Sequence, residues 1–514
     1  MRLLRGALLA LLVLLLVYPL ARLLAMGVGQ GASLSWRPLL NSGGLALLTG
    51  VLAAPAGAAL ALALERFSGR LVSLLGLALW LLFIMPGYVL TTGWLILFSH
   101  PQMRHSAFGH AFLGAGGLAF LYLVKALPFS VFVARATYAG AGASLREAAL
   151  VLRLPRWRRL GLGLRLALPA MAAGFTIAAI ETMQDFSIPA TLGVTGQLPV
   201  VTYSIYQRLN TTPADFAGAA RLCWWLIGAA AMLSLLQMAV QRRYRAVLVH
   251  GKARHGLRQR PRGAARAGLV GAALALWGLG LALPLLAMAD VALFGAAAPA
   301  DLFTAIPRSL GYGALAASLT LGLAMALLKL QRGRHPLFAG LLQAGLSANM
   351  AVPGLVLGAG YVVAFNNDFF PLYGTVLLLV IAYAAGTLPM AIRLVGGALA
   401  QLDARLDEAA RIFALSPQTR LIDIEAALLA RPGLQAWLLV VATVMFELPV
   451  SELLYVPGQM PLSVAILAAD MGGQYNEAAQ LALLGMGTLG LLALGLNLAL
   501  RLGRAKSGQE AARC

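Results

Sequence analysis

Apolar runs of about 20 residues recur along the whole chain, and they restrict its possible folds more than any other feature. A run of that length matches the roughly 20 residues with which a helix crosses the hydrocarbon core of a bilayer. Because backbone polar groups in lipid must pair with each other, such runs form helices. The alternation typical of a membrane β-barrel is absent from the sequence. We therefore expect an all-α polytopic membrane protein.

The composition supports this expectation. The chain has 514 residues, of which 60% are hydrophobic and only 11% are charged, whereas a soluble domain has about 25% charged residues. The first run lacks a small-x-small cleavage site, so we interpret it as a retained helix and not as a signal peptide. We expect about twelve spans, near residues 7–26, 44–64, 71–98, 111–134, 168–192, 216–240, 267–289, 309–328, 338–365, 373–392, 433–456 and 478–500.

Most of the positive charge lies in the segments that connect the expected spans. The net charge is +21, and 32 of the 39 Lys and Arg residues fall in alternate connecting segments. Positive side chains collect on the cytoplasmic side of membrane proteins. We therefore expect a multi-pass protein of the bacterial inner membrane with both termini in the cytoplasm and the lipid bilayer around it. Topology explains the charge, so we expect no nucleic-acid partner. These basic segments are the N-terminus, 65–70, 135–165, 241–266, 329–335, 393–431 and 501–514.

The chain contains an internal sequence repeat. Ile84–Gly93 matches Ala351–Gly360 at an offset of 267 residues, and both segments contain Pro-Gly. Leu127-Pro128 matches Leu388-Pro389 at an offset of 261. Asp185 lies opposite Glu447, and Pro199 lies opposite Pro461, both at 262. Each half begins inside and has six expected spans, so the repeats are parallel, with a transport pathway expected between them. We assign residues 1–240 to the first repeat, 241–266 to a basic cytoplasmic linker and 267–514 to the second repeat.

Both repeats carry Glu-Ala-Ala in their longest cytoplasmic loop. Glu147, Ala148 and Ala149 lie in the loop 135–165, and Glu408, Ala409 and Ala410 lie in the loop 393–431. Each segment is predicted to form a short amphipathic helix outside the membrane. Its small alanines permit close approach by a partner, and its carboxylate can bind a partner's arginine. The pattern therefore predicts two docking surfaces.

Two such motifs in a six-plus-six membrane chain resemble the permeases of type I ABC importers. The resemblance implies that the Glu-Ala-Ala segments are coupling helices, which dock on two ABC ATPase subunits, and that a periplasmic substrate-binding protein delivers the substrate. The chain has no G-x-x-x-x-G-K-[ST] loop, so ATP and Mg²⁺ are expected on the partner subunits, with no cofactor in this chain and no enzymatic activity of its own.

Fused double permeases of this length resemble the ferric-iron and thiamine uptake branch. Glu181–Phe186, Tyr203–Tyr206 and Phe446–Pro449 look most like the ferric-iron type. The resemblance implies uptake of ferric iron. Importers of thiamine, polyamines and aminoethylphosphonate share parts of this pattern and remain alternatives.

Three carboxylates fall inside expected spans. Glu181 and Asp185 lie four residues apart in the span 168–192, and Glu447 lies in the span 433–456. Intramembrane carboxylates are energetically costly and usually face a bundle interior or an aqueous cavity. Two hypotheses remain open: the three residues line a cation-friendly translocation pathway, or they form hydrogen bonds that hold the halves together.

Two other classes of protein are possible. A twelve-span secondary transporter also has two six-helix halves, but it does not need a docking helix after the fourth span of each half. A membrane enzyme would need clustered His, Asp or Cys residues. The six His and two Cys residues show no metal-ligand spacing on one helix, so we expect no metal site.

Overall fold

The computed structural model describes residues 2–28, 35–140, 155–193, 196–244, 259–331, 352–400 and 427–511, with the single residues 340, 345, 349 and 419. Helices make up almost all of this part of the chain, and its β pairing is limited to two isolated bridges. The all-α class expected from the apolar runs is confirmed. The expected coupling residues 147–149 and 408–410 lie outside the described residues.

The chain folds into two compact units, and neither unit is a continuous stretch of sequence. The first unit contains residues 1–25, 297–468 and 480–514, and the second contains residues 26–296 and 469–479. The beginning of the chain therefore packs with the second repeat, and residues 267–296 pack with the first. The assignment of sequence repeats to 1–240 and 267–514 remains a prediction, because compact units and sequence repeats are different divisions of the chain.

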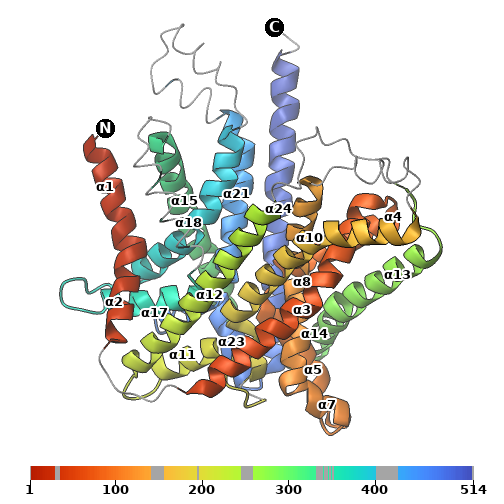
Figure 1. Ribbon diagram of the computed structural model, residues 1–514. Coiled ribbons are helices and arrows are strands. Elements are labelled where there is room, and N and C mark those ends of the chain that lie inside the picture. The colour runs from red at the N-terminus through yellow and green to blue at the C-terminus, as the bar shows by residue number, and fades with distance from the viewer. Residues whose placement is uncertain are drawn as a thin grey trace. The chain divides into compact units, whose positions relative to one another are not determined.

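The second unit is built around three long helices, α3, α8 and α10, which pack closely against one another and lie side by side in Figure 1. Small residues allow this close packing. A Cβ added to Gly50 would lie 2.7 Å from the ring of Phe175, and one added to Gly57 would lie 2.8 Å from Ser130 Cβ. The helices of this unit are α3 (Trp36–Arg66), α4 (Arg70–Ile84), α5 (Gly87–Ser99), α6 (Pro101–Arg104), α7 (Ala107–Phe112), α8 (Ala115–Gly140), α10 (Arg156–Gln184), a π-helical turn (Pro189–Gly193), α11 (Val201–Leu209), α12 (Phe216–Tyr244), α13 (Gly263–Leu274), a π-helical segment (Ala275–Ala282) and α14 (Leu283–Phe294).

In the first unit the N-terminal segment packs against α17. Tyr361 Oη donates a hydrogen bond to Leu15 O at 2.9 Å, and the ring of Tyr18 meets Phe365 and Phe370 edge to face. The helices of this unit are α1 (Arg2–Leu12), a π-helical turn (Val13–Val17), α2 (Tyr18–Met26), a 3₁₀ turn (Leu302–Thr304), α15 (Ala305–Gln331), α17 (Gly354–Phe365), α18 (Val376–Ala400), α21 (Ala427–Met445), α22 (Pro449–Leu454), α23 (Leu462–Met471) and α24 (Tyr475–Ala511), with residues 469–479 belonging to the second unit.

Within the described ranges, nine helices are long and apolar enough to cross a membrane, or ten if one bent pair counts as a span. Three of the expected spans are interrupted by a break. The span 71–98 is α4 followed by α5, bent by 99° at Met85-Pro86. The spans 168–192 and 433–456 also break, after Gln184 and Met445. The expected span 338–365 falls partly outside the described residues.

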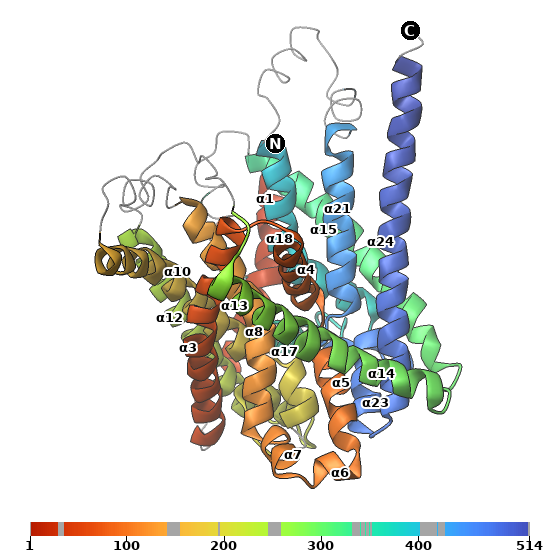
Figure 2. The same cartoon turned by 90° about the vertical axis from the view of Figure 1, so that its right-hand side faces the viewer.

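Helices α5 and α17 follow the two Pro-Gly motifs and are almost wholly buried. Eleven of the thirteen residues of α5 and eleven of the twelve residues of α17 are buried within the protein. Figure 2 shows α5 beside α14, where Gly93 touches Pro284. Sequence hydropathy cannot distinguish a helix that faces lipid from one enclosed by other helices, because both are apolar.

Candidate functional site

Asp185 lies at a break between two helices. Helix α10 ends at Gln184, and the chain at Asp185 is extended (φ −68°, ψ 127°) before a new helical segment begins. The carboxylate accepts hydrogen bonds from Ser187 Oγ at 2.7 Å, Ile188 N at 3.0 Å and Ser187 N at 3.4 Å. Asp185 therefore acts as an N-cap, because it satisfies N–H groups that have no partner within the new helix.

Glu447 has the same role in the other unit. It follows the end of α21, and its carboxylate accepts hydrogen bonds from Val450 N at 2.9 and 3.1 Å. Ser451 contributes its backbone N–H and its hydroxyl, each 3.0 Å from Oε2. The Tyr383 hydroxyl lies 2.7 Å from Ser451 Oγ and extends the network. Glu447 thus caps the first turn of α22, where negative charge is also favoured by the helix dipole.

The Pro-Gly motifs lie against these carboxylates. A Cβ added to Gly87 would lie 3.6 Å from Asp185 Oδ1, and one added to Gly354 would lie 3.4 Å from Glu447 Oε1. Both distances are ordinary contacts, but a Cβ at Gly87 would clash with Ser187 Oγ, the hydroxyl that donates to Asp185, so glycine is needed at that position. The two sequence features that repeat at offsets of 267 and 262 residues come together within each unit.

Hydroxyl side chains fix both breaks to neighbouring helices in the same way. Thr202 Oγ1 donates to Asp185 O at 2.9 Å, and Ser463 Oγ donates to Glu447 O at 2.5 Å. Ser42 Oγ accepts the backbone N–H of Val201 at 2.9 Å, and Ser309 Oγ accepts that of Leu462 at 2.6 Å. Ser42 and Ser309 are 267 residues apart, which equals the Pro-Gly offset. The repeat pattern carried this signal, but the sequence analysis did not identify it.

Lys125 distinguishes the first repeat from the second. Its ammonium group donates to the carbonyl oxygens of Leu82 at 3.3 Å, Phe83 at 3.2 Å and Met85. Pro86 has no N–H to bind the carbonyl of Leu82, so the ammonium supplies the missing donor at the end of α4. Glu181 and Asp185 interact electrostatically with Lys125.

The second repeat has uncharged residues at the positions equivalent to Lys125 and Glu181. The position equivalent to Lys125 is Gly386 at an offset of 261, and the position equivalent to Glu181 is Thr443 at 262. The ammonium and the carboxylate are thus replaced together by uncharged residues, which is consistent with their balancing each other. Glu181 lies on α10, and Asp185 lies at the break that follows α10. The two residues therefore do not lie on successive turns of one continuous helix.

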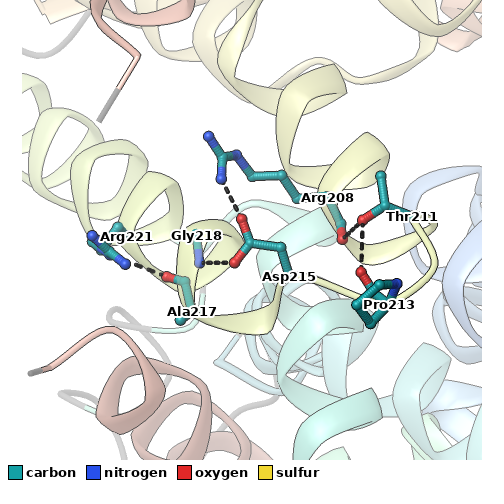
Figure 3. Close-up of polar contacts among 7 residues, drawn as sticks. All are labelled: Arg208, Thr211, Pro213, Asp215, Ala217, Gly218 and Arg221. Atoms are coloured by element: carbon teal, nitrogen blue, oxygen red, sulfur yellow. Dashed lines mark hydrogen bonds and ion pairs between the residues drawn. The ribbon is translucent and has the colours of Figure 1, made fainter. Parts of the chain in front are cut away.

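The loop between α11 and α12 holds a separate ion pair (Figure 3). An Arg208 guanidinium N–H donates to Asp215 Oδ2, and the backbone N–H of Gly218 donates to Asp215 Oδ1 at 2.7 Å. Burial alone would raise the pKa of the Asp215 carboxyl. The Gly218 and Arg208 hydrogen bonds, with the positive charges of Arg208 and Arg221, instead lower that pKa below its usual value. Asp215 therefore caps α12 as a carboxylate.

The carboxylates at the two breaks bind backbone N–H groups and hydroxyls. Glu181, Asp185 and Glu447 are all partly exposed within the protein. In the part of the chain that the structure describes, no group of three or more His, Cys, Asp or Glu residues could hold a metal ion. The arrangement positions short helices at two breaks.

Comparison with known proteins identifies related chains. A family model described as "Binding-protein-dependent transport system inner membrane component" matches residues 46–247 and again residues 318–503. The putative ferric transport system permease protein FbpB 1 of Haemophilus influenzae is 27% identical over 413 residues, covering 73% of this chain and 63% of the relative. The ferric transport system permease protein FbpB of Actinobacillus pleuropneumoniae is 27% identical over 426 residues, covering 74% of this chain and 59% of the relative. The chain spans about three fifths of the length of these curated relatives. No solved structure matches it.

The Lys125 network predicts a rescue between two substitutions. Lys125→Met removes the donor to three carbonyl groups and leaves Glu181 uncompensated, so we expect the free energy of unfolding to fall by about 3 kcal/mol. Glu181→Gln added to Lys125→Met should recover at least about 1 kcal/mol, and Lys125→Arg should cost less than Lys125→Met. Unfolding of the purified protein in mixed micelles measures these differences. Strictly additive effects would show that the two side chains do not interact.

The Asp215 carboxylate predicts a pH-dependent contribution to stability. Since the pKa of Asp215 is lower in the folded protein, its stabilising effect is present above the unfolded pKa of about 3.9 and disappears as the pH falls through the folded value. Asp215→Asn should lower the thermal midpoint at pH 7 by about 1–2 °C, as expected for a partly exposed pair, and by less at pH 3. Asp368→Asn, at an exposed position on another loop, serves as the control. A deficit that persists unchanged at pH 3 would contradict this assignment.

Proposed function

The chain belongs to the family of binding-protein-dependent transport system inner membrane components, and from that premise we propose that it forms the translocation pathway of an importer driven by separate ATPase subunits. The supporting observation is the repeated site. Each segment matched by the family model contains a carboxylate that caps a helix break, with hydroxyl groups that fix it in place. A single chain thus supplies both halves of the membrane component.

We propose ferric iron as the substrate. Both curated relatives are named as ferric transport permeases, and the sequences of the segments that contain Glu181, Tyr203 and Glu447 resemble that type. Thiamine, polyamines and aminoethylphosphonate are the alternatives. In such systems a periplasmic binding protein selects the substrate, and this chain provides the passage.

The proposed coupling segments are Glu147–Ala149 and Glu408–Ala410. They fall between α8 and α10 in the first repeat and between α18 and α21 in the second, so each connects two long helices. Two ATPase subunits, which carry ATP and Mg²⁺, dock on these segments. Displacement of a docked segment would be transmitted to the helices on both sides of it.

The proposed mechanism is alternating access. Closure of the ATPase dimer around ATP displaces both coupling segments and opens the pathway outward, and hydrolysis resets it inward. We propose that the protein lies in the bacterial inner membrane with both termini in the cytoplasm, since 32 of its 39 Lys and Arg residues fall in alternate connecting segments and basic residues collect on the cytoplasmic side.

The proposed role of Asp185 and Glu447 is to position the short helices that follow them. Their carboxylate oxygens are engaged by N–H and hydroxyl donors, yet both residues remain partly exposed. We therefore propose that they hold α22 and its counterpart after Asp185 at fixed breaks beside the pathway, with Glu181 as a third polar group. Their hydrogen bonds join elements within each unit, which favours a local capping role over one that holds the two halves together.

Co-purification tests the importer assignment. The tagged chain is expressed with a candidate ABC ATPase subunit, both as wild type and with Glu147→Arg and Glu408→Arg together. The wild type should retain the ATPase, and the double variant should lose at least about nine tenths of it, because like charges now face the partner's arginines. Each single variant is the matched comparison for the other repeat. Failure of any ATPase to associate with the wild type would remove the importer assignment and favour a secondary transporter.

Transport assays test the role of the two caps. Glu447→Gln keeps one acceptor oxygen but brings an NH₂ group toward the donors of α22, so uptake should fall by about tenfold while ATPase binding remains. Asp185→Asn should act in the same way. Thr443→Gln, at an exposed position of α21, provides the control. Normal uptake by both cap variants would exclude a role for these carboxylates in the pathway.

A further inference from the structure

Two basic segments that are far apart in the sequence meet at the ends of three helices. Phe67 and Gln259 form a parallel β-bridge, in which Ser68 N donates to Gln259 O at 3.0 Å and Gln259 N donates to Arg66 O at 3.1 Å. The bridge joins the turn between α3 and α4 to the residues that precede α13. It brings five arginines into one region, which we call the arginine surface: Arg66, Arg70, Arg260, Arg262 and Arg266.

The arginine surface has an excess of positive charge. All five side chains are exposed. The neighbouring carboxylate, Glu65, is bound to Arg135 at 2.5 Å, and neither ion pair found in the described residues includes one of the five arginines. The guanidinium of Arg66 lies 5.5 Å from the centre of the Phe67 ring, a contact that orients it. Guanidinium groups of this kind bind phosphate through paired N–H donors.

An apolar surface continues directly from the arginines along the same two helices. On α4, Leu74 and Leu77 are 47% and 49% exposed, and on α13, Leu274 is 69% exposed. Helices α4 and α13 pack against each other, so these side chains lie on adjoining helices. Residues 263–294 are also long and apolar enough to span a membrane. The arginines thus lie at the polar end of a lipid-facing surface, where phospholipid headgroups are found.

We propose that the arginine surface binds the phosphate-bearing headgroups of anionic phospholipids, whose acyl chains lie along the exposed leucines of α4 and α13. The combination of positive charge and adjoining apolar surface matches the two parts of a phospholipid, whereas an acidic soluble protein would use only the charge. Each arginine near an anionic bilayer surface adds to the attraction, so five act together. The inference rests on the proposed function in one respect: the topology proposed there assigns the arginine surface to the cytoplasmic leaflet of the membrane.

The test measures lipid binding by the full chain alone, without an ATPase. Purified protein in a neutral detergent is titrated with phosphatidylglycerol or with phosphatidylcholine of the same acyl chains, and bound lipid is counted by native mass spectrometry. The test variant is Arg66→Gln, Arg70→Gln, Arg260→Gln, Arg262→Gln and Arg266→Gln combined. The control is Arg37→Gln with Arg104→Gln, because both residues are exposed and Arg37 lies at the opposite end of α3 from Arg66.

The wild type should prefer phosphatidylglycerol over phosphatidylcholine, with binding that weakens as salt increases. The test variant should bind phosphatidylglycerol at least tenfold more weakly and phosphatidylcholine equally well, whereas the control pair should match the wild type. A second variant with five Arg→Lys substitutions should retain most of the preference, which would show that loss of charge and not misfolding explains the result.

Three outcomes would overturn the proposal. Equal binding of phosphatidylglycerol by the wild type and the test variant would exclude the arginine surface. Displacement of the lipid by inorganic phosphate at millimolar concentration would identify a free anion as the ligand. Unchanged lipid binding together with loss of ATPase co-purification would identify a protein-docking surface. Because lipid binding is measured on the chain alone, failure here is distinguishable from failure of the importer assignment.

Discussion

The capping of helix breaks by the carboxylates of Asp185 and Glu447 is the interaction on which the rest of the structure depends. Inside a membrane an unpaired N–H or C=O group costs several kcal/mol, so a helix can break only where other groups satisfy its ends. Asp185 and Glu447 satisfy the free N–H groups that follow the two breaks. Thr202 and Ser463 then donate to the carbonyl groups of these residues and fix their positions. These bonds permit short helices to lie where a continuous span would otherwise pass.

The two repeats share this framework but differ in charge. In the first repeat, Lys125 satisfies the carbonyl groups released at Pro86, and its charge is balanced by Glu181 and Asp185. In the second repeat, Gly386 and Thr443 occupy the equivalent positions. The duplicated fold has therefore kept the caps at both breaks, while the charged residues beside the first break are replaced by uncharged ones beside the second. Among the described residues, the first repeat therefore has more charge beside its break than the second.

Much of the site could be predicted from the sequence because the repeat marks it. The paired offsets of Pro-Gly and of Asp185 with Glu447 identified residues that converge in each unit. The capping role could not be predicted, because hydropathy treats residues 168–192 and 433–456 as uninterrupted spans. The ends of α10 and α21 depend on a local competition between helix continuation and side-chain hydrogen bonds, which a window average does not detect. The hydrogen bonds of Lys125 could not be predicted either, because its carbonyl partners lie 40 to 43 residues away at the end of α4.

The sequence by itself determined the class of the protein. Apolar runs, loop charge and the internal repeat require a duplicated helical membrane protein, since the bilayer restricts the backbone to helices and sorts charge by side. Only the tertiary structure decided which elements pack together. Residues 1–25 join the second repeat and residues 267–296 join the first, an exchange that no local pattern encodes. Hydropathy does not distinguish one apolar helix from another. Their packing partners are selected by close contacts such as Tyr361 with Leu15 and Gly93 with Pro284.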